Sequence, residues 1–484
     1  MGVFEKAREK IPVIKFLVDF QKSVFYPIIF GIICVISSFC SVEVYLPLIW
    51  LLAAGVIFSA LFTDDLKVFL VPFLMIYYAI GMDFEDSFVL TNGDIFARFE
   101  LNALIHFIIC GSLMAISLLV RMIWDRSILL PFKKRGAFLL GILCLDVVFL
   151  LNGIFSDRWI PMDLLYGALN AVVVTVTYLI FLGIFRSSKD AIPFLFKVML
   201  CFGFMVFAQI LILGCDLYAA GEFFYRDAEG QIVSVARDKI FLSWGLSTII
   251  GAASVVAIPS AFYFASRCKA SIAFIMSACV FLSVAFLINT RSALLCGIII
   301  MLLCVIICCN VGEAKKINRI WTAIIAFIGV IVGVVLIIKL DMSAIIQEIA
   351  SIFRLDTGSA GRIWLWESGL EDFIQFPVFG VGFAHGGNAD GITYSNVYSN
   401  MYHNIFVEFM GSMGVIGVVA FFVHIGEIIK AIVSRFSLKK LLLMATPLLI
   451  LSMSLFDNFF FYPNFQIVYT AFLVATEVYI EAKQ

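Results

Sequence analysis

Charged residues are scarce in this sequence of 484 residues. Lys, Arg, Asp and Glu make up 14% of it, whereas 63% of the residues are hydrophobic and the mean hydropathy is +1.08. A soluble domain usually has about 25% charged and roughly 45–50% apolar residues. The composition therefore excludes a water-soluble fold. The formal net charge of −1 gives no reason to expect a nucleic acid as a partner.

The sequence also lacks the marks of several other protein classes. Its 12 Cys lie mostly inside apolar runs, without paired spacing in the expected external loops, so we expect neither a disulfide framework nor a metal site. No cleavable signal peptide is recognisable around the first apolar run, and we expect that run to stay attached. We find no internal repeat, which argues against a transporter built from inverted repeats.

Long apolar runs fill most of the chain. A run of roughly 17–25 apolar residues can cross a hydrocarbon core about 30 Å thick as a helix. By that criterion we predict an all-α, polytopic membrane protein with about 14 transmembrane helices. We expect an amino-terminal transmembrane bundle over 1–263, a core over 264–426 with a long external loop at 340–403, and further spans over 427–484.

The distribution of Lys and Arg predicts how the spans are oriented. Most basic residues fall in loops on one side, for example in Arg186–Lys197 and Lys430–Lys440. Because basic loops resist translocation, we predict that this side is the cytoplasm and that both termini lie there. A few arginines face outward against the rule. Arg158 lies beside an acid and is interpreted as a solvated loop charge, whereas Arg291 and Arg362 stand at the starts of predicted helices.

These two arginines have the setting of an anion site. Arg291 follows a tight turn, Asn289-Thr290, that can cap the next helix, and Arg362 precedes a helix predicted over Ile363–Ile374. Guanidinium groups and the free N–H groups of a helix amino terminus favour a multiply charged anion such as a diphosphate. The alternative is that the arginines anchor lipid headgroups.

The helix predicted over Ile363–Ile374 is amphipathic. Trp366, Leu370 and Phe373 share one of its faces, because they follow the helical spacing. We expect this helix to lie on the membrane surface, with its Trp side chains at headgroup level.

A histidine stands at the outer end of a span predicted over 404–426, within Tyr402-His403-Asn404. There the helix dipole and the two guanidinium groups should keep the imidazole neutral, as a general base requires. The alternative is a structural histidine at the membrane interface. His385 is a second candidate, in a Gly-rich segment interpreted as a loop that covers a substrate. Tyr402 and Asn404 are secondary candidates for the site.

Polar residues also occur inside the predicted spans. His106 and His424 are interpreted as packed or hydrogen-bonded residues. Asp146 is a functional suspect by its position in an apolar span, but a hydrogen bond between helices is the plainer explanation. We leave it out of the candidate site.

The candidate residues occur in a distinctive order. Asn289–Ala293 is followed by Gly361-Arg362-x-x-x-Trp366, by Phe376–Gly382, and by His403-Asn404 with Glu408 and the glycines at 411, 414 and 417. In this order, and in the long external loop between the motifs, residues 270–425 resemble the O-antigen ligase and polymerase superfamily.

The resemblance implies an all-helical, GT-C-like membrane glycosyltransferase that inverts the anomeric centre and needs no metal or other cofactor. It implies that Arg291 and Arg362 bind the diphosphate of an undecaprenyl-diphosphate-linked donor, and that His403 is the general base. Glu408 and the glycines after it look like the family's helix-packing tail. The implied place is the periplasmic face of the bacterial inner membrane. The implied partners are a lipid-linked donor, a lipid-linked acceptor, membrane lipids and a chain-length regulator protein.

At least two activities share these motifs. A polymerase joins one lipid-linked repeat unit to another, and a ligase transfers the finished chain to the lipid A core. The many spans and a second sizeable external loop, Cys215–Lys239, favour the polymerase. A flippase or other transporter of lipid-linked oligosaccharides is a third alternative, but it predicts charges along a central cavity, whereas the outward charges here gather near one loop.

Overall fold

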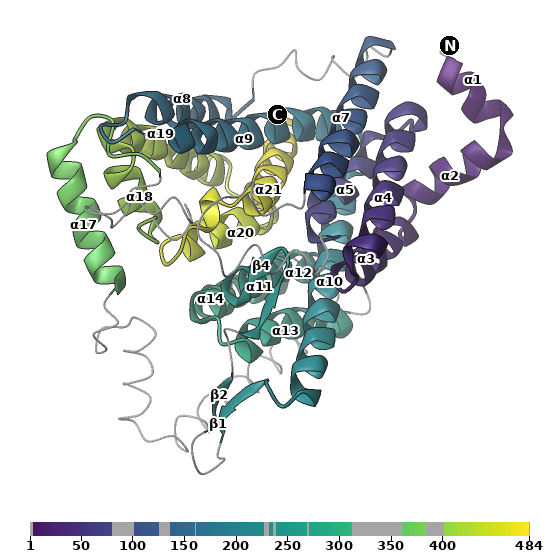
Figure 1. The fold of residues 1–484 in the computed structure, drawn as a ribbon. Helices are drawn as coiled ribbons and strands as arrows, with labels where there is room; N and C mark the ends of the chain where they lie inside the picture. Colours follow the sequence, from purple (N-terminus) through teal and green to yellow (C-terminus); the bar gives the residue numbers. More distant parts are fainter. Residues whose placement is uncertain are drawn as a thin grey trace.

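Helices make up nearly all of the structure (Figure 1). The computed structural model describes residues 3–79, 101–124, 136–159, 161–226, 232–235, 239–268, 271–311, 361–383 and 401–483. Within these ranges the strands form only two small antiparallel pairs. Helices satisfy their own backbone hydrogen bonds, as a chain inside a lipid bilayer must. The predicted fold class, a polytopic all-α membrane protein, is confirmed.

Within the described ranges, short connections join successive elements. The first half contains α1 (Val3–Lys10), α2 (Pro12–Lys22), α3 (Phe25–Ser38), α4 (Val42–Phe62), η1 (Leu66–Phe69), α5 (Leu70–Met75), η2 (Ile76–Ala79), α7 (Leu101–Trp124), α8 (Leu139–Phe155), α9 (Pro161–Ser187) and α10 (Ala191–Ala219). The strands are β1 (Phe224–Arg226), β2 (Ile232–Val235), β3 (Phe241–Leu242) and β4 (Gly245–Leu246). The second half contains α11 (Ser247–Val255), α12 (Ile258–Ala265), α13 (Ser271–Leu287), α14 (Arg291–Val311), α17 (Gly361–Gln375), α18 (Ile405–Gly411), α19 (Gly414–Val433), α20 (Leu438–Met453), η7 (Phe459–Phe461) and α21 (Pro463–Glu481).

Several helices can cross a membrane. In the described ranges six are long and apolar enough, and the pair α2 and α3, which meet at 82°, would make a seventh span. Shorter apolar helices, such as Leu139–Asn152 and Ser271–Leu287, accompany them. The predicted span at 320–339 lies outside the described residues. The number of about 14 spans therefore stays a prediction.

The span predicted over 404–426 is wrong in one respect, because the structure divides it into α18 and α19. Gly414 begins α19 with φ +65, a conformation that suits glycine. A Cβ on Gly414 would lie 2.4 Å from the carbonyl oxygen of Val378, and the N–H of Val415 donates to the carbonyl of Pro377 at 2.7 Å. Gly414 thus admits a neighbouring loop rather than another span, and only α19 has the length of a span.

An aromatic cluster supports the region around α18. Phe149 of α8 lies 5.7 Å from Phe383 and 6.3 Å from Phe409, measured between ring centroids. Phe461 completes the cluster at 5.5 Å from Phe409. All four side chains are buried. The cluster therefore fixes α8, the segment after α17, α18 and η7 relative to one another.

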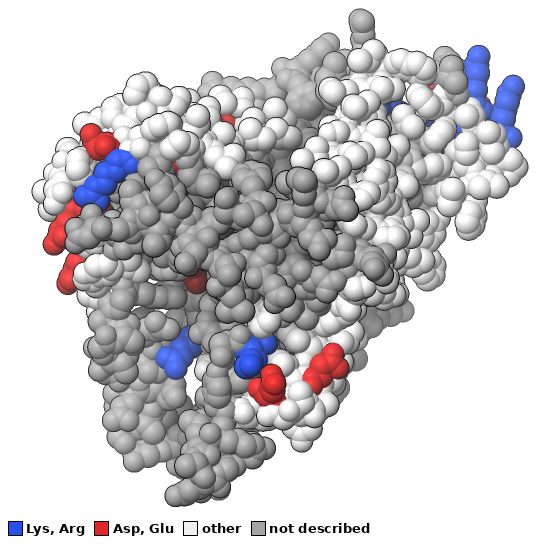
Figure 2. Space-filling model, in the orientation of Figure 1, with Lys and Arg blue, Asp and Glu red and all other residues white. Residues whose placement is uncertain are grey.

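Charge is unevenly distributed over the described surface. Figure 2 shows few charged side chains in the orientation of Figure 1, and they gather at the left edge, over α17, at the upper right, over α1, and in the lower middle of the view. Elsewhere in that view the described surface is mostly uncharged, as expected of helices that face lipid.

Candidate functional site

The candidate general base, His403, is paired with an acid. Its Nδ1 lies 2.9 Å from Oδ1 of Asp457 and 3.3 Å from Nδ2 of Asn458. The His403 side chain is 24% exposed and that of Asp457 7%, so the carboxylate is covered while part of the ring stays accessible. The shorter contact, to the carboxylate, assigns the proton to Nδ1. The lone pair of Nε2 is then available to accept a proton.

His403 lies in a turn that is tied to the end of α20. Its φ of +53 falls in the left-handed region, which residues other than glycine rarely adopt. The N–H of Ile405 donates to the carbonyl of Ser454 at 2.8 Å, and Nδ2 of Asn404 donates to the carbonyl of Leu455 at 3.0 Å. The side-chain oxygen Oδ1 of Asn404 also caps α18 by accepting from two backbone N–H groups. These bonds impose the turn and set the direction of the imidazole.

Tyr402 joins the same turn to α17. Its hydroxyl donates to Oδ2 of Asp372 at 2.6 Å, and Nη1 of Arg158 lies 3.5 Å from Oδ1 of that carboxylate. Burial and the neighbouring carboxylate raise the pKa of Tyr402 above its usual range, so the phenol stays protonated and remains a donor. Arg158 also stacks over the ring of Phe376. Arg158, interpreted from the sequence as a solvated loop charge, instead pairs with an acid of α17.

Glu408 secures this turn from within α18. Its Oε2 accepts from the N–H of Tyr402 at 2.9 Å, and its Oε1 accepts from the hydroxyl of Ser412 at 2.6 Å. The side chain is completely buried, and burial raises the pKa of Glu408 to about 7 although both hydrogen bonds lower it. Glu408 lies outside the span of α19. The resemblance assigned it to helix packing, and the structure shows that it anchors the turn before His403.

Arg291 is the first residue of α14, as predicted. The preceding turn has Asn289 at φ +52, a second left-handed residue other than glycine beside a candidate site residue. The hydroxyl of Thr290 donates to the carbonyl of Ser247 at 3.0 Å, which fixes the start of α14 against α11. The first turn of a helix offers free N–H groups, so this position suits an anion.

Arg291 and the paired residues His403 and Asp457 lie at the same end of the bundle. Cys296, near the start of α14, lies close to the side chain of Ser452 in the last turn of α20. The two helices pack against each other, and Asp457 follows α20 directly. The beginning of α14 is therefore beside the end of the helix that leads to Asp457.

Arg362 is the second residue of α17, and the observed helix confirms the one predicted over Ile363–Ile374. At 1.5 Å of rise per residue, Arg362 precedes Asp372 by about 15 Å of helix. Since Asp372 is bonded to Tyr402, the helix that carries Arg362 is fixed to the turn that carries His403.

The face through which α17 packs differs from the predicted one. Trp366 and Phe373 are only half-buried, and Leu370 is 45% exposed. The buried positions are Gly369 and Asp372. A Cβ on Gly369 would meet Val407 of α18, and Asp372 bonds to Tyr402 just before α18. The large apolar side chains that α17 exposes are Ile363, Trp364, Leu370 and Ile374. Its location on the membrane surface stays a prediction.

The remaining candidates have different outcomes. His385 and most of the predicted loop at 340–403 lie outside the described residues. Asp146 accepts a hydrogen bond from Thr175 of the next helix, which confirms its structural interpretation. His424 lies 2.5 Å from the hydroxyl of Tyr469. Over the part of the chain that is described, no group of three or more His, Cys, Asp and Glu could hold a metal ion.

Two acids of the site, Asp457 and Asp372, were not among the residues predicted from the sequence. A signal for the first exists, since Asp457 is the one charged residue between Lys440 and Glu477. An acid that persists in so apolar a stretch is expected to have a specific partner. No such signal exists for Asp372, because nothing in the sequence distinguishes it from its neighbour Glu371, which is exposed.

Comparison with known proteins gives one family. Residues 272–422 match the family model described as O-antigen ligase. The match begins in α13, contains α14, α17 and α18, and ends within α19, so it includes Arg291, Arg362 and His403. Asp457 and Arg158 lie outside it. None of the curated proteins compared with the chain matches it.

Proposed function

We propose that this chain, whose residues 272–422 match the O-antigen ligase family model, is a polymerase of O-antigen or a related surface polysaccharide. It joins repeat units carried on undecaprenyl diphosphate at the periplasmic face of the inner membrane, with both termini in the cytoplasm. The observation that carries the proposal is the accessible imidazole of His403, a residue inside the family match, which is bonded to Asp457.

His403 is the general base of the proposed reaction. The acceptor hydroxyl attacks the anomeric carbon of the donor sugar from the side opposite the diphosphate, and its proton passes to Nε2. The bond from that carbon to the diphosphate oxygen breaks, and undecaprenyl diphosphate leaves with the bonding electrons. A single displacement inverts the anomeric centre. Asp457 holds the ring by Nδ1 and stabilises the imidazolium that forms.

Arg291 and Arg362 bind the diphosphate in this proposal. Negative charge grows on the leaving group during displacement, and guanidinium groups at helix amino termini stabilise it. Two observations support this: Arg291 begins α14 at the same end as Asp457, and α17, which carries Arg362, is bonded to the turn before His403. Tyr402 and Asp372 act as positioning residues. The reaction takes no metal or other cofactor in this scheme.

The ligase is the second candidate, and the description of the matching family favours it. The same base and the same donor site would then serve an acceptor hydroxyl on the lipid A core. Only the acceptor distinguishes the two activities, so His403, Arg291 and Arg362 keep their roles in both. The proposed partners are the lipid-linked donor, the acceptor and membrane lipids, with a chain-length regulator protein for the polymerase.

Reconstitution separates these alternatives. Purified full-length protein in lipid vesicles is supplied with undecaprenyl-diphosphate-linked repeat units, with lipid A core added in a second arm. The polymerase lengthens chains in the first arm without an energy source. Transfer only in the second arm would replace the polymerase by the ligase. Movement across the bilayer without a new glycosidic bond would overturn both in favour of a flippase. The His403→Ala protein is the matched inactive control.

A further inference from the structure

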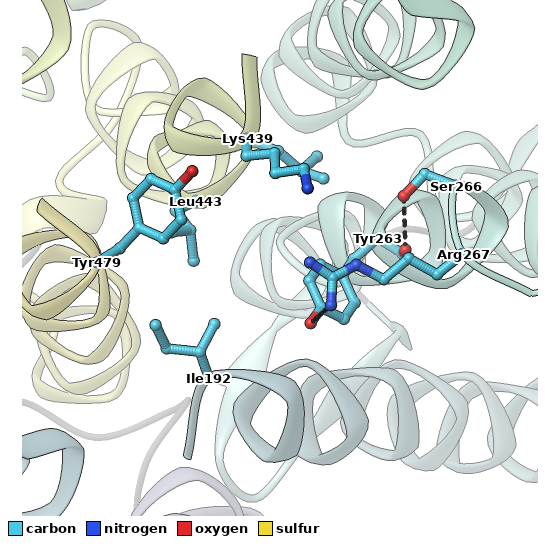
Figure 3. A pocket seen from close by; sticks show the side chains of 8 residues that line it. Ile192, Tyr263, Ser266, Arg267, Lys439, Leu443 and Tyr479 are labelled. Carbon is cyan, nitrogen blue, oxygen red and sulfur yellow. Dashed lines mark hydrogen bonds between the residues drawn. The ribbon is translucent and has the colours of Figure 1, made fainter. Parts of the chain in front are cut away.

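A crevice lined by cations opens where α10, α12, α20 and α21 meet. The empty space in and around it, open solvent included, is about 460 Å³. Figure 3 shows Arg267, Lys439 and Tyr479 around the crevice, each from a different helix or helix end. Ile192 and Leu443 give it apolar walls. Its described lining thus combines two cations, two phenols, a serine hydroxyl and aliphatic surface, with no carboxylate among them.

Arg267 is held in place without losing its charge. Its guanidinium carbon lies 4.1 Å from the ring centroid of Tyr263, and Nη1 donates to the hydroxyl of that ring. The same ring stacks on Phe196, with centroids 3.9 Å apart and an interplanar angle of 13°. An aromatic partner orients a guanidinium but does not neutralise it. The remaining N–H groups can therefore bind an anion in the crevice at little cost in side-chain entropy.

The crevice lies at the end of the bundle away from His403. Lys439 is in the first turn of α20, and Asp457 follows the last turn of that helix. Tyr479 is near the end of α21, which begins at Pro463, close after Asp457. The 16 residues of α20 span about 24 Å, close to the roughly 30 Å of a hydrocarbon core. The crevice and the candidate site thus lie at opposite ends of α20, and the crevice is at the end where the basic loops predict the cytoplasm.

We propose that this crevice is a binding site for the phosphate group of an anionic phospholipid at the cytoplasmic face. A guanidinium fork, an ammonium and a phenolic O–H are the donors that a phosphodiester accepts from. The aliphatic walls suit the glycerol and the first methylenes of the acyl chains. Basic pockets between transmembrane helices on the cytoplasmic side commonly bind such headgroups. The site is separate from the proposed donor site, and neither depends on the other.

Binding to purified full-length protein in a neutral detergent tests the site. The probes are dioctanoyl phosphatidylglycerol, its zwitterionic analogue dioctanoyl phosphatidylcholine, whose headgroup has no net charge, and inorganic phosphate. The Arg267→Gln/Lys439→Gln protein should bind phosphatidylglycerol roughly 30-fold more weakly than the wild type, since each basic residue contributes on that scale near a membrane surface. Lys439→Gln alone, at an exposed position, should bind about fivefold more weakly and carries the test if the double variant fails to fold.

A charge-matched control removes two exposed cations of the same predicted side outside the crevice, in Lys189→Gln/Lys430→Gln, and should bind like the wild type. Unfolding midpoints of all variants show whether they are folded. Three results would overturn the proposal: phosphatidylglycerol affinity unchanged in the crevice variants, phosphatidylcholine bound as tightly, or inorganic phosphate bound as tightly. The last result would assign the crevice to a soluble phosphate instead of a lipid.

Discussion

The hydroxyl of Tyr402 donates to the carboxylate of Asp372, and this hydrogen bond joins the turn before His403 to the helix that carries Arg362. Two parts of the candidate site that lie far apart in the sequence are thereby held at a fixed distance. The bond is buried, and Arg158 pairs with the other oxygen of the same carboxylate. The geometry of the site therefore depends on residues that need not touch a substrate.

Tyr402→Phe removes only this hydroxyl. We expect the variant to be less stable by about 1–3 kcal/mol, because a buried carboxylate loses its donor. Thermal unfolding of the detergent-solubilised protein measures this. Donor affinity should also fall, since α17 is held less firmly. Tyr218→Phe, at a side chain that is 71% exposed, is the control and should leave both quantities unchanged. Equal unfolding midpoints for the two variants would contradict the role of Tyr402.

Asp457→Asn tests the acid behind His403. The variant keeps the size of the side chain but no longer stabilises the imidazolium, so we expect the rate of sugar transfer to fall on the order of 10². Donor binding should change little, because the diphosphate is bound elsewhere. Glu371→Gln, which removes an exposed acid from α17, is the charge-matched control and should retain activity. A variant at Asp457 with the wild-type rate would leave His403 without its proposed partner.

Gly414→Ala tests why the predicted span is broken. The new methyl group would meet the carbonyl of Val378 in a residue whose φ is positive, so the variant should be clearly destabilised. Gly426→Ala in the same helix is the matched control, since a Cβ there meets nothing within 4 Å. In the control, alanine should stabilise the helix by roughly 0.5–1 kcal/mol. The opposite order of unfolding midpoints would show that the break does not need glycine.

Glu408 should make stability depend on pH. Burial raises the pKa of Glu408 to about 7 from the 4.5 expected of the unfolded chain, so the folded protein binds the proton more tightly than the unfolded one. This contribution is fully present below about pH 4.5 and is lost as the pH rises through about 7. Between pH 5 and about pH 8, we expect the unfolding midpoint of the wild type to fall relative to that of Glu408→Gln, because only the wild type loses the contribution of Glu408. A constant difference over that range would rule out titration of Glu408.

The local features of this fold could be predicted from the sequence because their causes are local. Apolar runs predict spans, a capping turn predicts the start of α14 at Arg291, and helical spacing predicts α17. The division of the span at Gly414 could not be predicted, since its cause is a loop nearly forty positions earlier, at Pro377–Val378.

The candidate site could be predicted only in part for the same reason. The sequence indicates His403 because it stands at the outer end of a predicted span. Its pairing with Asp457 joins residues that are 54 positions apart in the chain. The contact of Arg158 with Asp372 is longer still in sequence, and it joins the loop after α8 to α17, two segments with no shared sequence pattern. Spacing reports neighbours along one helix, whereas these contacts depend on how helices pack.

The most direct test of the account is single-turnover sugar transfer by His403→Ala, measured together with the affinity for an undecaprenyl-diphosphate-linked donor. We predict that the variant folds, binds the donor like the wild type and forms no new glycosidic bond. Arg291→Ala and Arg362→Ala should show weakened donor binding in the same assay. Transfer by His403→Ala at a near-normal rate would contradict the central claim that this imidazole accepts the proton of the attacking hydroxyl.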